Sequence, residues 1–173
     1  MDLTKVIRTV PNWPIEGVMF RDITTILQDP VAFRVAIDLF YARYKDTALD
    51  KIAGIDARGF IFGSALAYRM GVGFVPVRKK GKLPFTTISA SYSLEYGKDT
   101  VEMHSDAISS GEKVLIVDDL IATGGTISAA VQLVQQLGGD ILECAFVVEL
   151  PDLKGRERIP DQKVFSLCSF EGD

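Results

Sequence analysis

The chain has 173 residues, of which 47% are hydrophobic and 24% are charged, which fits one globular domain with a full hydrophobic core. Its net charge of −4 argues against a general nucleic-acid-binding protein, which would carry a basic surface. No apolar run approaches the ~20 residues of a membrane helix, and the N-terminus shows no signal peptide. The two cysteines, Cys144 and Cys168, lie in apolar runs and are expected to be buried thiols rather than a disulfide. We therefore expect a single cytoplasmic domain, residues 1–173.

Strand and helix patterns alternate along most of the chain. Residues 11–30 are rich in turn formers and predict a loop with short structure. Asp29 and Pro30 then mark a helix start, with the aspartate as cap and the proline in the first turn. Two further helices are expected over residues 60–71 and 126–139, and strands over residues 51–56, 73–77, 113–119, 141–150 and 163–170.

This alternation predicts an α/β fold with right-handed βαβ units and a mainly parallel central sheet flanked by helices. The strands are apolar throughout rather than alternating, as expected when helices cover both faces of a sheet. Residues 78–107 do not fit this pattern, because they are long, polar and aromatic. A connection of this length predicts a functional lid or a protruding hairpin.

The stretch VLIVDDLIATGGT places two adjacent aspartates and a double glycine between a buried strand and a helix. Ligands of open parallel sheets bind beyond the carboxyl ends of the strands, where Asp118 and Asp119 are expected. Gly124 and Gly125 permit a tight turn, and the following helix presents free N–H groups and the positive end of its dipole to an anion.

The ligand expected here carries a phosphate close to groups that donate hydrogen bonds to carboxylates. A ribose 5-phosphate meets both demands, with its hydroxyls on Asp118 and Asp119. Its phosphate would lie in the turn formed by Ala122, Thr123, Gly124, Gly125 and Thr126. The GxxxxGK[ST] and GxGxxG patterns of other nucleotide sites are absent. The simpler alternative is a helix that follows a strand with two surface acids.

The same stretch closely resembles the phosphoribosyl-diphosphate (PRPP) motif of the type I phosphoribosyltransferase family. The resemblance extends over nearly the whole chain to the adenine-specific branch of that family, through GVMFRDIT, GIDARGFIFG, RKKGKLP, ASYSLEYG and VVELPDLKGRE. It implies an N-terminal hood over about residues 1–30 and a flexible lid over about residues 78–107. It also implies a homodimeric enzyme that joins adenine to PRPP, giving AMP and diphosphate, with Mg²⁺ carried by the PRPP and diphosphate oxygens.

A second segment, Asp56-Ala57-Arg58-Gly59, follows a strand and should lie at the same edge of the sheet. Gly59 leaves room for a close approach, and Arg58 is either a surface residue at a helix start or a planar fork for phosphate oxygens. In the family the matching loop binds diphosphate, and the peptide bond at the position of Asp56–Ala57 is often cis. Many relatives carry serine where this chain has Ala57, which puts one hydroxyl contact in doubt.

The basic run RKKGK, residues 78–82, reads by itself as a solvated turn. Beside a diphosphate site it becomes a candidate for binding the phosphate charge. Arg78 is the best candidate by position, followed by Lys79 and Lys82.

The resemblance also implies how the base is held. Phe20 would stack on adenine, the main chain of Met19 and Arg21 would read the purine edge, and Leu120 would pack on the other face. Without the resemblance, Phe20 would be read as an ordinary core residue.

The implied catalytic residues are Arg58, which stabilises the leaving diphosphate, and Glu95, which handles a proton on the base when the lid closes. A lone loop glutamate is otherwise simply exposed. His104, the only histidine, is predicted to be exposed or structural, and the scarcity of His and Cys argues against a dedicated zinc site.

Two alternatives remain open. One is a phosphoribosyltransferase for hypoxanthine, guanine, xanthine or orotate. The other is a non-catalytic PRPP-binding regulator of transcription. The stretch GVMFRDIT and a lid that contains Glu95 favour the adenine enzyme, and the acidic balance disfavours a DNA-binding regulator.

Overall fold

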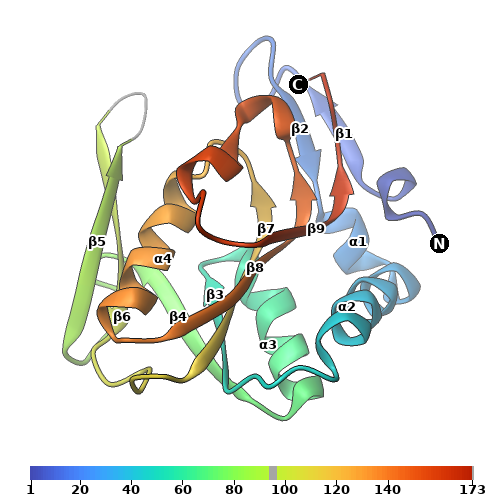
Figure 1. Cartoon of the computed structure of the whole chain (residues 1–173). Coiled ribbons are helices and arrows are strands. Elements are labelled where there is room, and N and C mark those ends of the chain that lie inside the picture. Colours follow the sequence, from blue (N-terminus) through green and yellow to red (C-terminus); the bar gives the residue numbers. More distant parts are fainter. Residues whose placement is uncertain (94–96, 173) are drawn as a thin grey trace.

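The computed structural model describes residues 1–93 and 97–172 of the chain. In this part of the chain the centre is a seven-stranded sheet with the order β5-β6-β4-β3-β7-β8-β9 (Figure 1). Neighbouring strands from β4 through β3, β7 and β8 to β9 are parallel, whereas β6 runs antiparallel to β4 and β5. The predicted α/β class with a mainly parallel sheet is confirmed. The strands are β3 (Lys51–Ile55), β4 (Gly73–Lys79), β5 (Thr87–Ser93), β6 (Lys98–His104), β7 (Lys113–Ile121), β8 (Asp140–Glu149) and β9 (Val164–Ser169).

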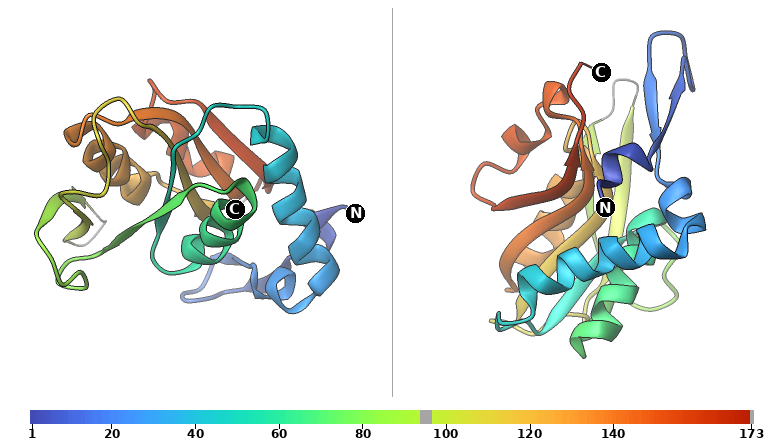
Figure 2. Two further views of the ribbon diagram at one scale, coloured as in Figure 1. Left: turned by 90° about the horizontal axis from the view of Figure 1, so that it is seen from below. Right: turned by 90° about the vertical axis from the view of Figure 1, so that its right-hand side faces the viewer.

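Helices cover both faces of the sheet, as the apolar strands predict. They are α2 (Pro30–Tyr44) and α3 (Arg58–Met70) on one face and α4 (Gly125–Gln136) on the other (Figure 2). Along β7, Leu115 and Val117 pack with α2 and α3, whereas Val114 and Ile116 pack with α4. Because each face of the strand meets a helix, the whole strand is apolar.

The ends of two helices follow the predicted local signals. Asp29 Oδ1 accepts hydrogen bonds from the N–H groups of Val31 at 2.8 Å and Ala32 at 3.2 Å, and Pro30 takes the first helical position. Gly71 closes α3 in the left-handed conformation, at φ 71°, which glycine adopts without a steric penalty.

The N-terminal segment is more regular than the predicted loop with short structure. β1 (Arg8–Pro11) and β2 (Met19–Asp22) form an antiparallel hairpin, which is followed by the short helix α1 (Thr24–Gln28). Figure 2 shows that this hairpin stands clear of the central sheet, at the same end of the molecule as the C-terminus. The chain therefore builds a projecting element where the sequence predicted a hood.

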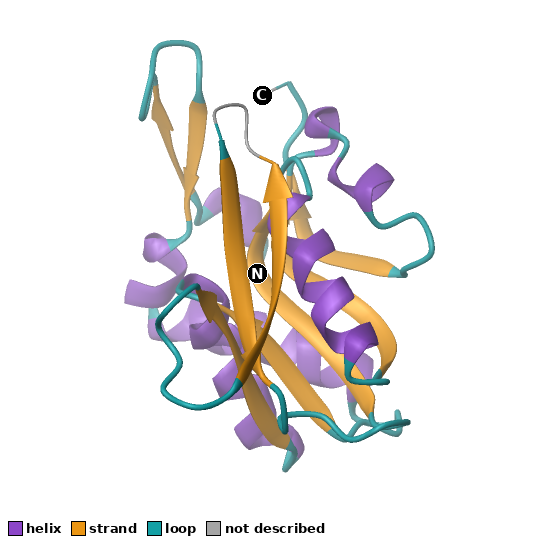
Figure 3. Cartoon of the chain, turned by 90° about the vertical axis from the view of Figure 1, so that its left-hand side faces the viewer, coloured by secondary structure: helices purple, strands orange, loops and turns teal. Residues whose placement is uncertain are grey.

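Within residues 78–107, β5 and β6 are antiparallel neighbours, and both belong to the central sheet. β5 and β6 pair along their length, and β6 joins β4 through Arg78↔Glu102 and Lys79↔Val101 (Figure 3). Arg78 and Lys79 thus lie within β4, not in a turn after it. Of the two structures predicted for this segment, a lid or a hairpin, the hairpin pairing is observed. The movement of a lid stays a prediction. Glu95 lies outside the described residues.

The two cysteines and the histidine lie in strands of the central sheet. Cys144 and Cys168 are free and buried, as predicted, and burial raises the pKa of Cys144 to about 12 and that of Cys168 to about 11. His104 is half-buried at the end of β6, where its ring meets that of Phe85 edge-on at 6.2 Å. None of the described helices is both long and apolar enough to cross a membrane.

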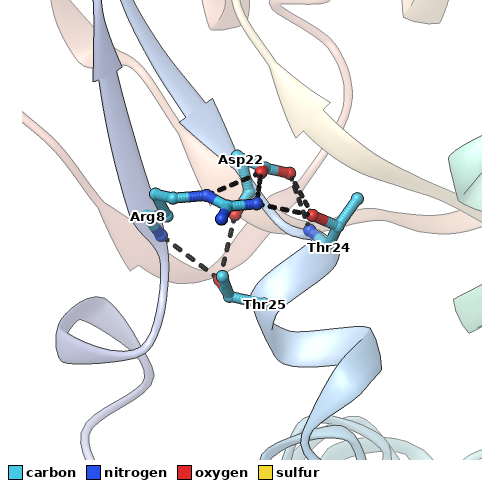
Figure 4. Close-up of polar contacts among 4 residues, drawn as sticks. All are labelled: Arg8, Asp22, Thr24 and Thr25. Carbon is cyan, nitrogen blue, oxygen red and sulfur yellow. Dashed lines mark hydrogen bonds and ion pairs between the residues drawn. The ribbon is translucent and has the colours of Figure 1, made fainter.

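Asp22 ties the base of the N-terminal hairpin together (Figure 4). Its Oδ2 accepts from Arg8 Nε at 3.0 Å and from a second Arg8 nitrogen at 2.5 Å, while its Oδ1 accepts from the Thr24 hydroxyl at 2.6 Å. The Thr24 hydroxyl, followed by Arg8, lowers the pKa of Asp22 from its ordinary 3.8 to about 2. The ionised form is therefore the one that stabilises the folded chain.

We expect Asp22→Asn to lower the free energy of unfolding by roughly 1–2 kcal/mol at pH 7, through lost charge-assisted hydrogen bonds. A group with a lowered folded pKa stabilises above its unfolded value and loses that effect as pH falls. The difference between wild type and variant should thus be constant above about pH 4 and shrink towards pH 2. Urea unfolding at pH 7 and pH 3 measures this difference in the free energy of unfolding, with Asp161→Asn as an exposed control. An equal difference at both pH values would contradict a stabilising role of the ionised Asp22.

Candidate active site

A cleft of about 290 Å³ opens at the carboxyl ends of β3 and β7. Residues 55–58, Lys79 and residues 118–127 line it. β3 pairs with β7 only as far as Val117, whereas β8 continues to pair with β7 up to Ile121. The structure thus brings together, at one place, segments that the sequence assigned separately to the sheet edge.

Asp118 and Asp119 lie within β7, which continues two residues beyond its predicted end at Asp119. The reason is the length of β8, which holds β7 in extended form for four residues after Val117, on one side of the strand. On the other side β3 has already ended, so both aspartates border the cleft. Leu120 and Ile121 follow them in the lining.

The two carboxylates differ in their surroundings. Asp119 is 5% exposed, and its Oδ2 accepts from Arg58 Nε at 2.5 Å. The backbone N–H of Asp119 donates to Asp118 Oδ1 at 2.8 Å. Burial, and then the charge of Asp119, raise the pKa of Asp118 well above its ordinary value. A cation or an electron-poor sugar in the cleft would favour the ionised form of Asp118, because an opposite charge stabilises it.

The glycine turn, residues 122–126, leads directly into α4. Gly124 occupies the cap position at φ 81° and has no side chain that could cap the helix. The first N–H groups of α4 therefore face the cleft region, where an anion is favoured. A Cβ on Gly124 would collide with the carbonyl oxygen of Gly155, and a Cβ on Gly155 would collide with that of Ala122.

This contact adds a second reason for a glycine at position 124. The sequence predicted that Gly124 permits a tight turn. A side chain there would also meet the short helical segment η3 (Gly155–Arg158) behind the turn. Gly124 is required by its positive φ and by the neighbouring backbone, so the turn is braced from the side away from the ligand region.

Residues 56–59 combine a cis peptide with close packing. The Asp56–Ala57 bond is cis, as the family resemblance implied. A Cβ on Gly59 would lie 2.7 Å from Asp118 Oδ1 and 2.8 Å from the carbonyl oxygen of Val117. The predicted close approach at Gly59 is therefore the approach of α3 to β7, which brings Arg58 next to the paired aspartates.

Three cations of the predicted diphosphate site each bind a carboxylate. Arg58 binds Asp119, Arg78 Nε donates to Asp56 Oδ2 at 2.9 Å, and Lys79 binds Asp99. Burial lowers the pKa of Arg58, but the charges of Asp119 and other acids outweigh it and raise that pKa overall. In the free protein these positive charges are thus compensated by acids at fixed places.

The hood residues lie outside the cleft lining. Phe20 is half-buried, with its ring edge-on to Trp13 at 4.4 Å, and Met19 is 37% exposed. Arg21 lies 4.4 Å above the ring of Phe170. Of the four residues predicted to hold the base, only Leu120 borders the cleft. Their roles remain predictions. A base bound in the cleft would contact Met19, Phe20 and Arg21 only if the β1–β2 hairpin lay over it.

Comparison with known proteins identifies the family. The Phosphoribosyl transferase domain family matches residues 22–172. An adenine phosphoribosyltransferase of Desulfosudis oleivorans is 67% identical over 173 residues, which cover 100% of both chains. The chain belongs to the adenine phosphoribosyltransferase family.

Solved adenine phosphoribosyltransferases share the fold. That of Thermoanaerobacter pseudethanolicus is 48% identical, with a TM-score of 0.92 over 97% of this chain and 98% of that one. That of Saccharomyces cerevisiae is 45% identical, with a TM-score of 0.91 over 95% of this chain and 96% of that one. The yeast enzyme was solved with adenine and an imino-altritol bisphosphate.

Sequence reasoning missed several residues that shape this adenine phosphoribosyltransferase cleft. Gly155 lies in the stretch VVELPDLKGRE, which resembled the family but carried no assigned role. Tyr92 packs on the glycine turn, because a Cβ on Gly125 would lie 2.8 Å from its Cδ2. Asp99 binds Lys79 from β6. The only sequence signal for Gly155 was its place in a family motif. No local sequence pattern marks Tyr92 or Asp99.

We expect Gly124→Ala to reduce AMP affinity more than roughly tenfold and to lower Tm, because the turn must shift away from Gly155. Gly111→Ala is the matched control, since Gly111 has φ 84° but no atom within 4 Å of an added Cβ. It should lose only about 1–2 kcal/mol of stability from its backbone conformation and keep its AMP affinity. Calorimetric titration with AMP and thermal unfolding measure both. Equal behaviour of the two variants would show that Gly155 does not brace the turn.

Proposed function

We propose that this protein transfers the 5-phosphoribosyl group of PRPP to adenine, giving AMP and diphosphate, as a purine-salvage enzyme. The observation that carries the proposal is one cleft that combines two adjacent carboxylates, a free helix N-terminus and Arg58. Full-length similarity to adenine phosphoribosyltransferases supports the choice of base. Incubation with PRPP, Mg²⁺ and each purine in turn, with detection of the nucleotide, tests it directly.

The cleft offers a separate place for each part of PRPP. The 5′-phosphate would bind the N–H groups of the glycine turn at the start of α4. The ribose hydroxyls would donate to Asp118 and Asp119, and the diphosphate would reach the loop at 56–59. Binding in this way requires Arg58 to exchange Asp119 for a phosphate oxygen, since the two are hydrogen-bonded in the free protein.

Mg²⁺ fits this arrangement as a companion of the substrate. The described residues contain no group of three or more His, Cys, Asp or Glu side chains that could hold a metal ion by themselves. The carboxylate oxygens of Asp118 and Asp119 are hard donors beside the expected ribose, which is the chemistry that Mg²⁺ prefers. When bound, Mg²⁺ would neutralise charge on the diphosphate leaving group.

The proposed reaction is a displacement at ribose C1. The bond from C1 to the diphosphate oxygen breaks, and a bond from C1 to adenine N9 forms. Arg58 would stabilise the leaving oxygens, with Arg78 and Lys79 as further cations. Positive charge that builds on the sugar would face Asp118 and Asp119. Adenine N9 loses a proton as it attacks, and we propose Glu95 as its acceptor.

The base would be held by the hood and by Leu120. Phe20 would stack on one face of adenine, and the main chain of Met19 and Arg21 would read its edge. A homodimer, which the family resemblance implies, and a cytoplasmic location, which the sequence predicts, also belong to this proposal.

We expect adenine to be preferred over hypoxanthine by at least roughly a hundredfold in kcat/KM. Hypoxanthine exchanges donor and acceptor at both N1 and the 6-position, and each unpaired buried group costs about 1–3 kcal/mol. Met19→Leu should keep this preference because the readers are backbone groups, whereas Phe20→Ala should weaken all purines together. Hypoxanthine within tenfold of adenine would favour the phosphoribosyltransferases for other bases instead.

We expect Glu95→Gln to lower kcat by about 10²–10⁴-fold, the usual contribution of a general base, while AMP affinity changes little. The pH dependence of kcat should lose its acidic limb in the variant, because the carboxylate that titrates is gone. A variant with normal kcat would remove Glu95 from the chemistry. Wild-type protein that binds PRPP but forms no nucleotide with any purine would instead support the regulator.

A further inference from the structure

We propose that Asp99 is a positioning residue that competes with diphosphate for Lys79 and so keeps the affinity for this product low. The inference rests on the proposed function, since it concerns the diphosphate end of the same cleft. Three cation–carboxylate pairs were described above. The acids of two of them, Asp119 and Asp56, line the cleft, whereas Asp99, the partner of Lys79, does not.

Lys79 is held at the edge of the cleft by two groups from the hairpin. It is the last residue of β4, its side chain is 48% exposed, and it lines the cleft. Its ammonium binds the Asp99 carboxylate on β6 and donates to the hydroxyl of Tyr92 at 3.2 Å. The ammonium therefore rests next to the cleft but with its charge already satisfied.

Asp99 is itself fixed by its neighbours. Its Oδ2 accepts from the Tyr92 hydroxyl at 3.0 Å, and its Oδ1 accepts from the N–H of Thr100 at 2.8 Å. Tyr92 in turn packs against Gly125 at the start of α4. The carboxylate is thus anchored to the backbone of β6 and to the ring that covers the glycine turn, and it cannot follow Lys79 into the cleft without breaking these bonds.

The other two pairs differ in what happens when their cation moves. Asp119 and Asp56 both line the cleft, so a ligand there can offer them new partners when Arg58 and Arg78 turn to phosphate. Asp99 gains no such partner, and only Tyr92 and Thr100 remain. Breaking the Lys79–Asp99 pair therefore subtracts from diphosphate binding, and a weakly held product leaves readily, which matters where product release limits turnover.

Two roles for Asp99 predict changes of opposite sign. If it merely orients Lys79 for binding, removing its charge should weaken the affinity for diphosphate. If it competes, removing its charge should strengthen that affinity. Because both partners are partly exposed, the effect should be modest, roughly two- to fivefold in Kd.

The test is calorimetric titration of the full-length protein with Mg²⁺ and inorganic diphosphate. Asp99→Asn should lower Kd about two- to fivefold, and Lys79→Met should raise it. In the Lys79→Met background, adding Asp99→Asn should change nothing, because the competition needs the ammonium. Tyr92→Phe, which keeps the ring on Gly125 but removes a second partner of Lys79, should lower Kd by a smaller factor.

Asp140→Asn is the matched control for net charge. Asp140 pairs with Lys113 at 2.8 Å, and both side chains are partly exposed. They are the first residues of β8 and β7, so they lie at the amino ends of these strands, away from the cleft. This variant should leave Kd unchanged. A tighter Kd in Asp140→Asn would reduce the effect to long-range charge and overturn the proposal.

An unchanged or weaker Kd in Asp99→Asn also overturns it, as does tightening that persists without Lys79. Formation of AMP from adenine and PRPP, assayed on the same preparations, distinguishes this failure from failure of the proposed function. Active wild-type protein with an unchanged Kd in Asp99→Asn refutes only the competition. Wild-type protein that forms no AMP refutes the proposed function itself.

Discussion

The structure depends on one mismatch in strand length. β3 stops pairing with β7 at Val117, while β8 supports β7 as far as Ile121. The carboxyl end of β7 is therefore held straight on one side and open on the other. Two aspartates placed in that open stretch face a cleft and remain anchored in a sheet, which positions their carboxylates more rigidly than a loop would.

Glycine contacts convert this opening into a defined site. Gly59 lets α3 pack directly on β7, so Arg58 arrives beside Asp119. Gly124 and Gly155 let two backbone segments meet behind the glycine turn, so the start of α4 points its N–H groups to the same cleft. At these positions the absent side chain serves the packing of the protein against itself, and the site inherits its geometry from that packing.

The charges of the free site are arranged in local pairs. Arg58 and Lys79 line the cleft and each has an acidic partner, and Arg78 is paired with Asp56 of the lining. A substrate rich in negative charge must exchange these partners, and each exchange lowers the net gain from binding. Such an arrangement favours a ligand that offers new partners to the released carboxylates as well as to the cations.

The sequence by itself determined the α/β class, the capped start of α2, the end of α3 and the segments that meet at the cleft. These features depend on interactions within a few residues, such as the Asp29 cap, the Gly71 conformation and the apolar period of the strands, so local pattern is sufficient. The family motifs added the assignments of Glu95 and of the hood, which remain predictions.

Only the tertiary structure decided which groups act on one another. The pairing of Lys79 with Asp99, the brace of Gly155 behind Gly124 and the extension of β7 past β3 join residues far apart in the chain. The order of strands in the sheet and the lengths of their neighbours set these distances, and no periodicity in the sequence encodes either. The residue types of the site could thus be read from the chain, whereas their partners depend on how the sheet is assembled.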